Sequence, residues 1–164
     1  MKVILAMVVS ADGKSTKGDL PPKEWASRED QIYLSKLIRK QKLIVMGSNT
    51  YLSAKKIIKL SPKTLRVVLT KSPKKYKKDL VAGQLEFSSD SPTTLVKSLE
   101  HLGYKQMLLL GGIEVNTSFF KANLINELWL TIEPKIFGKG KGVVAEKTFD
   151  INLKLKSLEK LNKQ

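Results

Sequence analysis

The stretch MLLLGGIEV, Met107 to Val115, decides the fold that we expect for this chain. Met107–Leu110 are apolar and fit a buried strand, and two glycines follow at once. Helical spacing then begins, at Val115, Ser118, Phe119 and Ala122. A strand that ends in glycines and enters a helix leaves N–H groups and the positive end of the helix dipole free, which suits a phosphate. A simple tight turn is the alternative interpretation.

On both sides of this stretch, apolar segments that fit strands alternate with segments of helical periodicity. The continuously apolar residues of Lys2–Ser10 predict a central strand buried on both faces. Further strands are expected at Leu43–Met46, Leu65–Leu69, Gln84–Phe87, Met107–Leu110 and Leu128–Ile132, with a last edge strand around Leu153, Leu155 and Leu158. Helices are expected from Ser27 to Gln41, Ser48 to Lys59, Pro92 to Leu102 and from the glycine pair to Ala122. This alternation predicts one α/β domain over residues 1–164 with a largely parallel sheet.

Composition narrows the possible chemistry. The chain has 164 residues, no cysteine and one histidine, so thiolate catalysis and Cys-based metal sites are excluded and a reducing cytoplasm is expected. No apolar run is long enough to span a membrane. The net charge of +15 is nearly all lysine, which would attract anionic substrates. A lysine-rich nucleic-acid-binding domain is a remote alternative, because nucleic-acid readers usually carry arginine.

Three strand ends carry groups suited to phosphate. Gly47–Thr50, Thr70–Ser72 and Gly111–Val115 each follow a predicted strand with glycines, hydroxyls, an amide or a lysine. Together they indicate a phosphorylated nucleotide or dinucleotide along the carboxyl edge of the sheet. Neither GxGxxG nor GxxxxGK[ST] is present.

Asp30 is a carboxylate at the edge of an apolar helix face. Helical spacing places it with Leu34, Leu37 and Ile38, where desolvation would raise its pKa and suit it to proton delivery. Capping of the helix by Asp30 is the alternative. The long polar loop at residues 11–26 ends in Trp25, and loops of this length often act as lids.

These residues resemble one superfamily. Ile44–Tyr51 (IVMGSNTY), the Gly111-Gly112 pair and Leu128–Glu133 (LWLTIE) are similar to dihydrofolate reductases. Ser10–Lys14 (SADGK), Trp25–Asp30 (WASRED) and the stretch 111–140 look more like the reductase domain of the riboflavin-biosynthesis deaminase-reductase. The resemblance implies a dihydrofolate reductase-like fold with about eight strands and an antiparallel C-terminal edge.

The resemblance further implies NADPH-dependent hydride transfer to a C=N bond. The cofactor would contact Ala6, Asp12, Gly13, Gly47, Ser48, Asn49, Thr50, Thr70, Lys71, Ser72, Gly111, Gly112, Ile113, Glu114 and Val115. Thr70, Lys71 and Ser72 would lie near the adenosine 2′-phosphate. The substrate would contact Met7, Val8, Asp30, Leu34, Lys63, Arg66, Leu110 and Asn116.

Four residues are implied in catalysis. Asp30 would help to protonate the substrate, Thr131 would support it, and Trp25 would close the lid. Glu29 is a rival acid, because the spacing between Asp30 and Gly47 is one residue longer than is usual in dihydrofolate reductases. Its helical face, with Tyr33, Lys36 and Lys40, is more polar.

The substrate remains a choice between two classes. Thr131 and the segment MGSNTY favour dihydrofolate, and Lys63 or Arg66 would then hold its glutamate tail. Asn116, where dihydrofolate reductases commonly have tyrosine, argues against it. The riboflavin-pathway pyrimidine 5-amino-6-(5-phosphoribosylamino)uracil is the alternative, although the Asp-Asp-Pro segment of many such reductases is missing. No metal, nucleic acid or membrane partner is expected, and either a monomer or a homodimer is compatible with the sequence.

Overall fold

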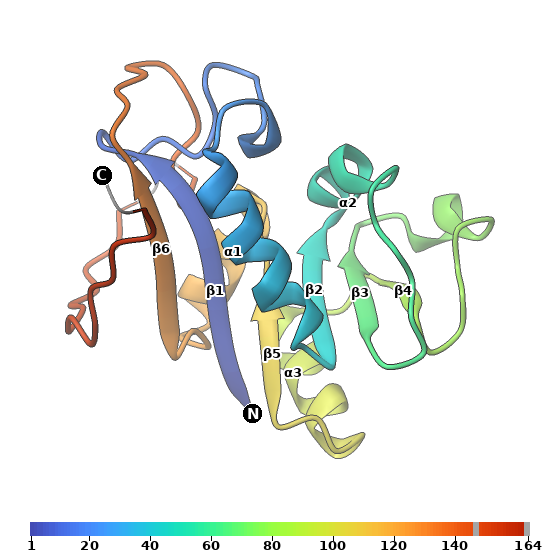
Figure 1. The fold of residues 1–164 in the computed structure, drawn as a ribbon. Helices are drawn as coiled ribbons and strands as arrows, with labels where there is room; N and C mark the ends of the chain where they lie inside the picture. Colours follow the sequence, from blue (N-terminus) through green and yellow to red (C-terminus); the bar gives the residue numbers. More distant parts are fainter. Residues whose placement is uncertain (146–147, 163–164) are drawn as a thin grey trace.

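A computed structural model describes residues 1–145 and 148–162 and contains one six-stranded sheet. The strands are β1 (Lys2–Ser10), β2 (Leu43–Gly47), β3 (Leu65–Leu69), β4 (Leu85–Ser88), β5 (Gln106–Leu109) and β6 (Glu127–Glu133). The helices are α1 (Arg28–Arg39), α2 (Ser48–Ala54), α3 (Pro92–His101) and α4 (Ile113–Lys121), with short 3-10 turns η1 (Pro22–Glu24) and η2 (Pro73–Tyr76). Figure 1 shows all strand arrows pointing to the same edge of the sheet.

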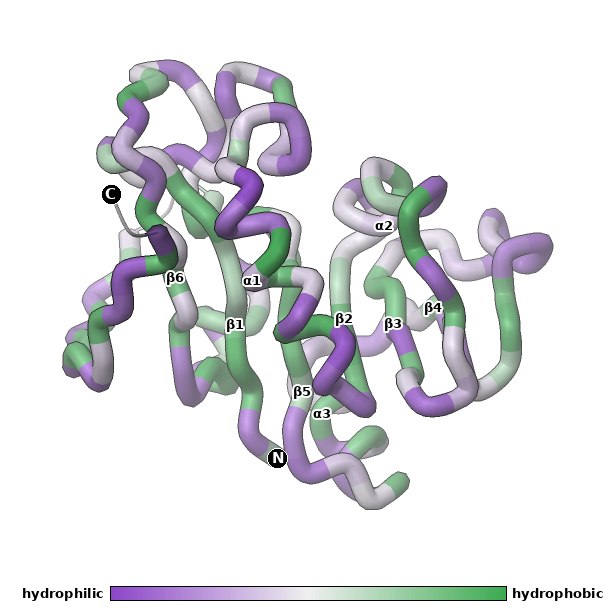
Figure 2. Tube along the Cα trace, in the orientation of Figure 1, coloured by the Kyte–Doolittle hydropathy of each residue, from purple (hydrophilic) through white to green (hydrophobic). Residues whose placement is uncertain are grey.

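The sheet order is β4-β3-β2-β5-β1-β6, and every neighbouring pair is parallel. Residues of β1 are buried on both faces, as its continuous apolar run predicts. Side chains on one face of the sheet pack against α3 and α4, and those on the other face pack against α1 and α2. Figure 2 shows the hydrophobic residues concentrated along the strands, with hydrophilic residues in the connecting loops.

Local signals explain where the two longest helices begin. The Ser27 hydroxyl accepts a hydrogen bond from the Asp30 amide at 3.2 Å, which caps α1. At α3, Ser91 caps the Thr94 amide in the same way, and Pro92 occupies the first turn. None of the described helices has the length and apolar character needed to span a membrane.

Two expectations about the sheet are wrong. It has six strands rather than about eight, and it has no antiparallel edge among the described residues. The segment around Leu153–Leu158 lies outside the sheet, with Leu153 69% and Leu155 78% exposed. Alternating leucines predict which face of a strand is apolar, but they do not supply a neighbouring strand with free hydrogen-bonding groups. Helix α2 also ends at Ala54, earlier than Lys59.

Candidate active site

The three predicted phosphate-binding strand ends lie side by side, because β3, β2 and β5 are consecutive in the sheet. The amide of Gly47 donates to the Gly111 oxygen at 2.6 Å, which joins the β2–α2 and β5–α4 junctions. A Cβ on Gly47 would lie 2.9 Å from Cγ2 of Val115, and one on Gly112 would lie 3.3 Å from Oγ1 of Thr50. Glycine is therefore needed where the two junctions approach each other.

The glycine pair itself has a specialised backbone. Gly111 has φ +80°, and the Gly111–Gly112 peptide bond is cis. The N-terminus of α4 begins directly afterwards at Ile113, with the exposed Glu114 in its first turn. Ile113 and Val115 are half-buried. The backbone of Gly47, Gly111 and Gly112 is therefore bare of side chains at the positive end of α4, a geometry suited to a phosphate or pyrophosphate. We call these three residues the glycine surface.

The third strand end continues this surface beyond β2. The Thr70 amide donates to the Ser88 oxygen at 2.9 Å, and the Ser72 amide donates to the Thr70 hydroxyl at 3.3 Å. Lys71, between them in the chain, is an exposed cation, while Ser48 and Thr50 are half-buried and Asn49 is exposed on α2. Hydroxyls and one cation therefore follow the glycine surface along the sheet edge.

A small pocket lies farther along the sheet, between α1 and the strands β1 and β6. Its lining residues are Ala6, Met7, Val8, Asp30, Tyr33, Leu34, Trp129 and Thr131. It contains Asp30, Thr131, Met7, Val8 and Leu34 from the sequence prediction. Met7 also connects the pocket to α4, because the Asn116 amide group donates to its sulfur at 3.0 Å. A substrate in the pocket would therefore lie one strand away from the glycine surface.

Asp30 is the acidic group of this pocket and is only 4% exposed. Burial raises the pKa of its carboxyl, the hydrogen bond from Thr131 lowers it, and the nearby negative charge of Glu133 raises it again. A raised pKa keeps a proton on the group closer to neutral pH, as a proton donor requires. Glu29 is exposed on the neighbouring face of α1 and does not line the pocket.

Glu133 is a second buried carboxylate that sequence reasoning missed. It is 5% exposed, its Oε1 accepts from the Ser27 amide at 3.0 Å, and its Oε2 lies 3.8 Å from the Lys135 ammonium. It thereby holds the start of α1 against the end of β6. The available signal was an acidic residue at the end of an apolar strand, where a charge is expected to be solvated rather than buried.

The predicted lid is packed against a second loop. The Trp25 ring meets Phe137 edge-on with centroids 4.9 Å apart, and the Lys135 ammonium donates to the Trp25 backbone oxygen. The indole nitrogen of Trp25 is buried without a hydrogen-bond partner among the described residues. Trp25 therefore holds the predicted lid against residues 135–137.

Asp12 and Gly13 occupy the turn after β1. The Asp12 carboxylate accepts from the Ser10 hydroxyl at 2.5 Å and from the amides of Phe137 and Gly138 at 3.1 and 2.8 Å. These bonds lower the pKa of Asp12 to about 2, with the Ser10 bond contributing most. Gly13 has φ +76°, with open space around the position of a Cβ. Asp12 thus connects the turn after β1 to the loop after β6 through hydrogen bonds to Phe137 and Gly138.

Three predicted substrate contacts lie elsewhere. Lys63 and Arg66 stand at the amino end of β3, at the opposite edge of the sheet from the carboxyl ends of the strands. Asn116 is fully buried, and its amide nitrogen is used by Met7 and by the Val143 oxygen at 2.8 Å. Sequence position alone does not show which edge of the sheet or which layer a side chain occupies. Leu110 is half-buried beside Gly111.

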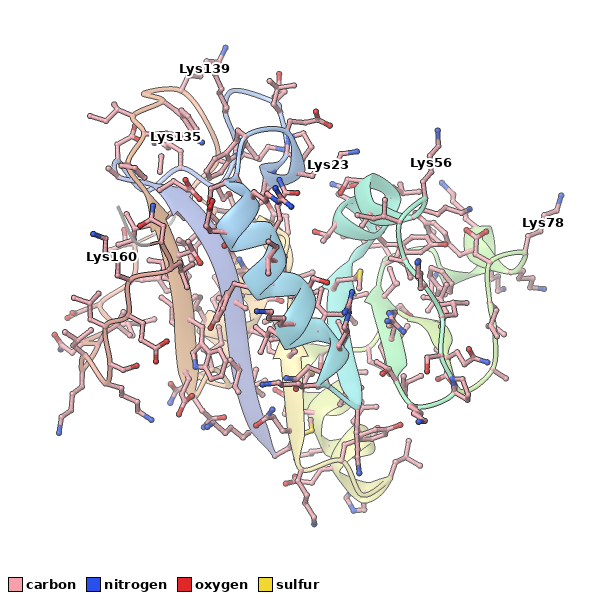
Figure 3. The ribbon with its side chains drawn as sticks, viewed as in Figure 1. Lys23, Lys56, Lys78, Lys135, Lys139 and Lys160 are labelled. Atoms are coloured by element: carbon pink, nitrogen blue, oxygen red, sulfur yellow. The ribbon has the colours of Figure 1, made fainter. Side chains whose placement is uncertain are left out.

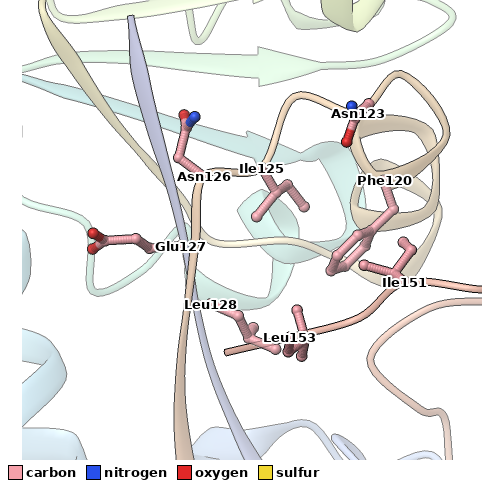
Figure 4. A pocket seen from close by; sticks show the side chains of 8 residues that line it. All are labelled: Phe120, Asn123, Ile125, Asn126, Glu127, Leu128, Ile151 and Leu153. Carbon is pink, nitrogen blue, oxygen red and sulfur yellow. The ribbon is translucent and has the colours of Figure 1, made fainter. Parts of the chain in front are cut away.

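A second pocket lies between the end of α4, the start of β6 and the C-terminal segment. Figure 4 shows Phe120, Ile125, Leu128, Ile151 and Leu153 converging on it. Its carboxylate, Glu127, is engaged by Lys2 at 3.0 Å and Lys156 at 2.7 Å. An apolar pocket whose acid is already neutralised by lysines offers little chemistry, so the Asp30 pocket is the candidate active site.

The lysines do not form a single binding face. In Figure 3, the labelled Lys23, Lys56, Lys78, Lys139 and Lys160 point outward from different sides of the molecule. Among the described residues, no group of three His, Asp or Glu side chains could hold a metal ion. This distribution is that of a generally basic surface rather than of a groove that follows a nucleic-acid backbone.

Comparison with known proteins identifies the family. The family model described as RibD C-terminal domain matches residues 1–164. A search of curated protein sequences found no match.

Three solved structures resemble the chain closely in fold. A diaminohydroxyphosphoribosylaminopyrimidine deaminase/5-amino-6-(5-phosphoribosylamino)uracil reductase from Thermotoga maritima has a TM-score of 0.71 at 18% identity, covering 92% of this chain and 49% of that one. A pyrimidine reductase-like protein from Corynebacterium diphtheriae has a TM-score of 0.71 at 15% identity, covering 92% and 83%. RibD from Acinetobacter baumannii has a TM-score of 0.69 at 16% identity, covering 92% and 51%. The chain thus spans about half the length of the Thermotoga and Acinetobacter proteins.

Proposed function

The chain belongs to the RibD C-terminal domain family, and on that premise we propose that it is an NADPH-dependent reductase of the riboflavin-pathway pyrimidine 5-amino-6-(5-phosphoribosylamino)uracil. Reduction of dihydrofolate, which the sequence led us to expect first, is not supported by the family match. The name of the Thermotoga relative includes 5-amino-6-(5-phosphoribosylamino)uracil reductase, which supports the pyrimidine instead. The observation within this chain that carries the proposal is the buried Asp30 in a pocket beside the glycine surface.

NADPH fits the glycine surface for a physical reason. A Cβ at Gly47 or Gly112 would crowd the junction between α2 and α4, so both positions leave backbone available to a pyrophosphate. Residues Gly47–Thr50 and Gly111–Val115 would hold that group, and Thr70–Ser72 would lie toward the 2′-phosphate. When bound, NADPH would supply the hydride that adds to the carbon of a substrate C=N bond.

Asp30 would supply the matching proton. Its pKa is raised by burial, so its carboxyl retains a proton more readily than an exposed aspartate and can deliver it to the substrate nitrogen. The Thr131 hydroxyl orients the carboxylate after the proton has left, because a hydrogen bond stabilises the charged form. The packed Trp25 and Phe137 rings would help to exclude water from the pocket.

A substrate comparison tests this function. Purified protein is mixed with NADPH and either the phosphoribosylamino-uracil or dihydrofolate, and the loss of NADPH absorbance is followed. Oxidation of NADPH with the pyrimidine and none with dihydrofolate is expected. Turnover with dihydrofolate alone would return the assignment to a dihydrofolate reductase, and NADPH oxidation with neither would remove the proposed substrate class.

A further inference from the structure

A cluster of three side chains joins α2 to the end of the η2 loop. The Lys55 ammonium donates to both carboxylate oxygens of Asp79, at 2.6 and 2.7 Å, and the Tyr51 hydroxyl donates to the same carboxylate. Charge-assisted bonds of this two-oxygen kind are among the stronger hydrogen bonds in proteins. We call Tyr51, Lys55 and Asp79 the α2 latch.

Aromatic packing reinforces the α2 latch from within. The Tyr51 ring is 2% exposed and meets Tyr76 of η2 and Phe87 of β4 edge-on, with centroids 6.0 and 5.3 Å apart. Tyr76 and Phe87 stack on each other at 4.7 Å with nearly parallel rings. The η2 turn is therefore packed against both α2 and β4, so a movement of one of these three elements would disturb the rings of the others.

The loop held by the α2 latch carries many like charges. Between Thr70 and Asp79 it exposes Lys71, Lys74, Lys75, Lys77 and Lys78. These ammonium groups repel one another and would push the loop outward if its far end were free. The start of the loop is tied to β4 through Thr70 and Ser88, and its far end is tied to α2 through Asp79.

The consequence concerns two segments assigned to the cofactor. Helix α2 begins with Ser48–Thr50 and carries Tyr51 on its next residue, while the latched loop begins with Thr70–Ser72. We infer that the α2 latch is a positioning device that holds these two segments at a fixed separation and thereby sets the preference for NADPH over NADH. This inference rests on the proposed function. Tyr51, Lys55 and Asp79 act here as positioning residues and not as contacts of the cofactor.

Two physical effects predict opposite results when the α2 latch is broken. By charge alone, Asp79→Asn removes a negative group and would strengthen the binding of the 2′-phosphate. By its effect on position, the same substitution frees the loop and would weaken the binding of the 2′-phosphate. Tyr51→Phe changes no charge and removes only the hydroxyl, so it reports position alone.

The experiment measures the dissociation constants of NADPH and NADH by titration for the wild type, Tyr51→Phe and Asp79→Asn. Both variants are expected to bind NADPH about fivefold more weakly, with NADH changed by less than about twofold. Lys55→Arg keeps the ion pair and should keep the wild-type preference. Glu100→Gln is the matched control, because it removes an exposed carboxylate paired with the N-terminus, away from this loop.

The outcomes separate the possible failures. The positioning role would be overturned if Tyr51→Phe kept the wild-type preference for NADPH over NADH, or if Asp79→Asn bound NADPH more tightly than the wild type. An equal loss of affinity for both nucleotides would also overturn it. Wild-type protein that binds neither nucleotide would overturn the proposed function and the inference with it.

A second measurement does not depend on any nucleotide. Trypsin cleaves after lysine, and the latched loop is rich in exposed lysines. Cleavage within residues 70–79 of the folded protein should be faster in both latch variants than in the wild type or Glu100→Gln. Equal cleavage rates in all four proteins would show that the α2 latch does not hold the loop, and would overturn the inference.

Discussion

Asp30 is held in an environment that opposes its own charge. Burial and the neighbouring Glu133 disfavour the carboxylate, and the Thr131 hydroxyl favours it. A folded-state pKa above the unfolded value means that this group contributes stability below its unfolded pKa and loses that contribution as pH rises through the folded pKa. At pH values above its unfolded pKa, Asp30 therefore costs stability, as is common for groups retained for function.

Replacing Asp30 with Asn should separate the role of its proton in turnover from its cost to stability. Asn keeps an oxygen that can accept from Thr131 but has no acidic proton, so turnover should fall by about 100-fold or more. The melting temperature at pH 7 should rise, because Asn has no group whose ionisation is disfavoured by folding. Steady-state kinetics and calorimetry measure the two.

Glu29→Gln provides the control one residue away. Since Glu29 is exposed, both turnover and melting temperature should stay close to the wild type. A large loss of turnover in this variant, with Asp30→Asn still active, would make Glu29 the acid.

The pKa of Asp12 is shifted in the opposite direction, downward. Its folded-state pKa of about 2 lies below the ordinary aspartate value of 3.8, so its contribution to stability is present above about pH 4 and is lost as pH falls toward 2. Urea midpoints of the wild type and Asp12→Asn should therefore differ at pH 6 and converge as pH approaches 2. A constant difference between the two proteins over this range would contradict the assigned hydrogen bonds.

At the scale of elements, the lid and the loop after β6 behave as one unit. The Ser15 amide donates to the Lys141 oxygen at 2.6 Å, the Gly18 amide to the Lys139 oxygen at 2.9 Å, and the Lys141 amide to the Thr16 hydroxyl at 2.8 Å. Figure 1 shows both loops together above the end of β1. Because the same loops carry Trp25 and Phe137, we expect any closure over the Asp30 pocket to involve both.

Gly140→Ala tests this coupling. A Cβ at Gly140 would lie 2.0 Å from the Thr16 backbone oxygen, so the two loops would have to separate. Turnover is expected to fall by about tenfold or more, since a small displacement of a closing loop has large effects on rate, and the melting temperature should also fall.

Gly142→Ala is the matched control for that substitution. Its nearest neighbour would be the Val144 oxygen at 3.5 Å, an ordinary contact. If both variants lost turnover equally, the contact between Gly140 and Thr16 would not be the cause.

At the scale of the whole molecule, the net charge of +15 acts on every anionic ligand. The field of dispersed lysines extends over about 30 Å at 0.01 M salt and about 8 Å at 0.15 M. Such a field raises the encounter rate of an anionic cofactor without changing the chemistry at Asp30.

Raising the salt concentration from 0.01 to 0.15 M should therefore increase the KM for NADPH several-fold and leave kcat nearly unchanged. NADH, with less negative charge, should show a smaller increase in KM. Initial rates at saturating substrate measure both constants. A fall in kcat of the same size as the rise in KM would mean that salt disturbs the folded site itself.

Sequence patterns determined much of this molecule because they report local physics. The apolar run of β1 and the strand–glycine–helix stretch at Met107–Val115 predicted buried parallel strands and the glycine surface. The spacing of Leu34, Leu37 and Ile38 placed Asp30 correctly on the inner face of α1, and Ser27 was correctly chosen as its cap. In each case the deciding interactions join residues that are close in the chain.

Only the tertiary structure decided what depends on distant neighbours. It placed Arg66 and Lys63 at the wrong edge for the pocket, buried Asn116 against Met7, and left Leu153 and Leu155 outside the sheet. It also brought Glu133 to Asp30 and Asp79 to Tyr51. The physical reason is the same each time: burial, pKa and strand pairing depend on groups that the chain brings together from far apart, whereas local periodicity specifies only the face that each residue presents.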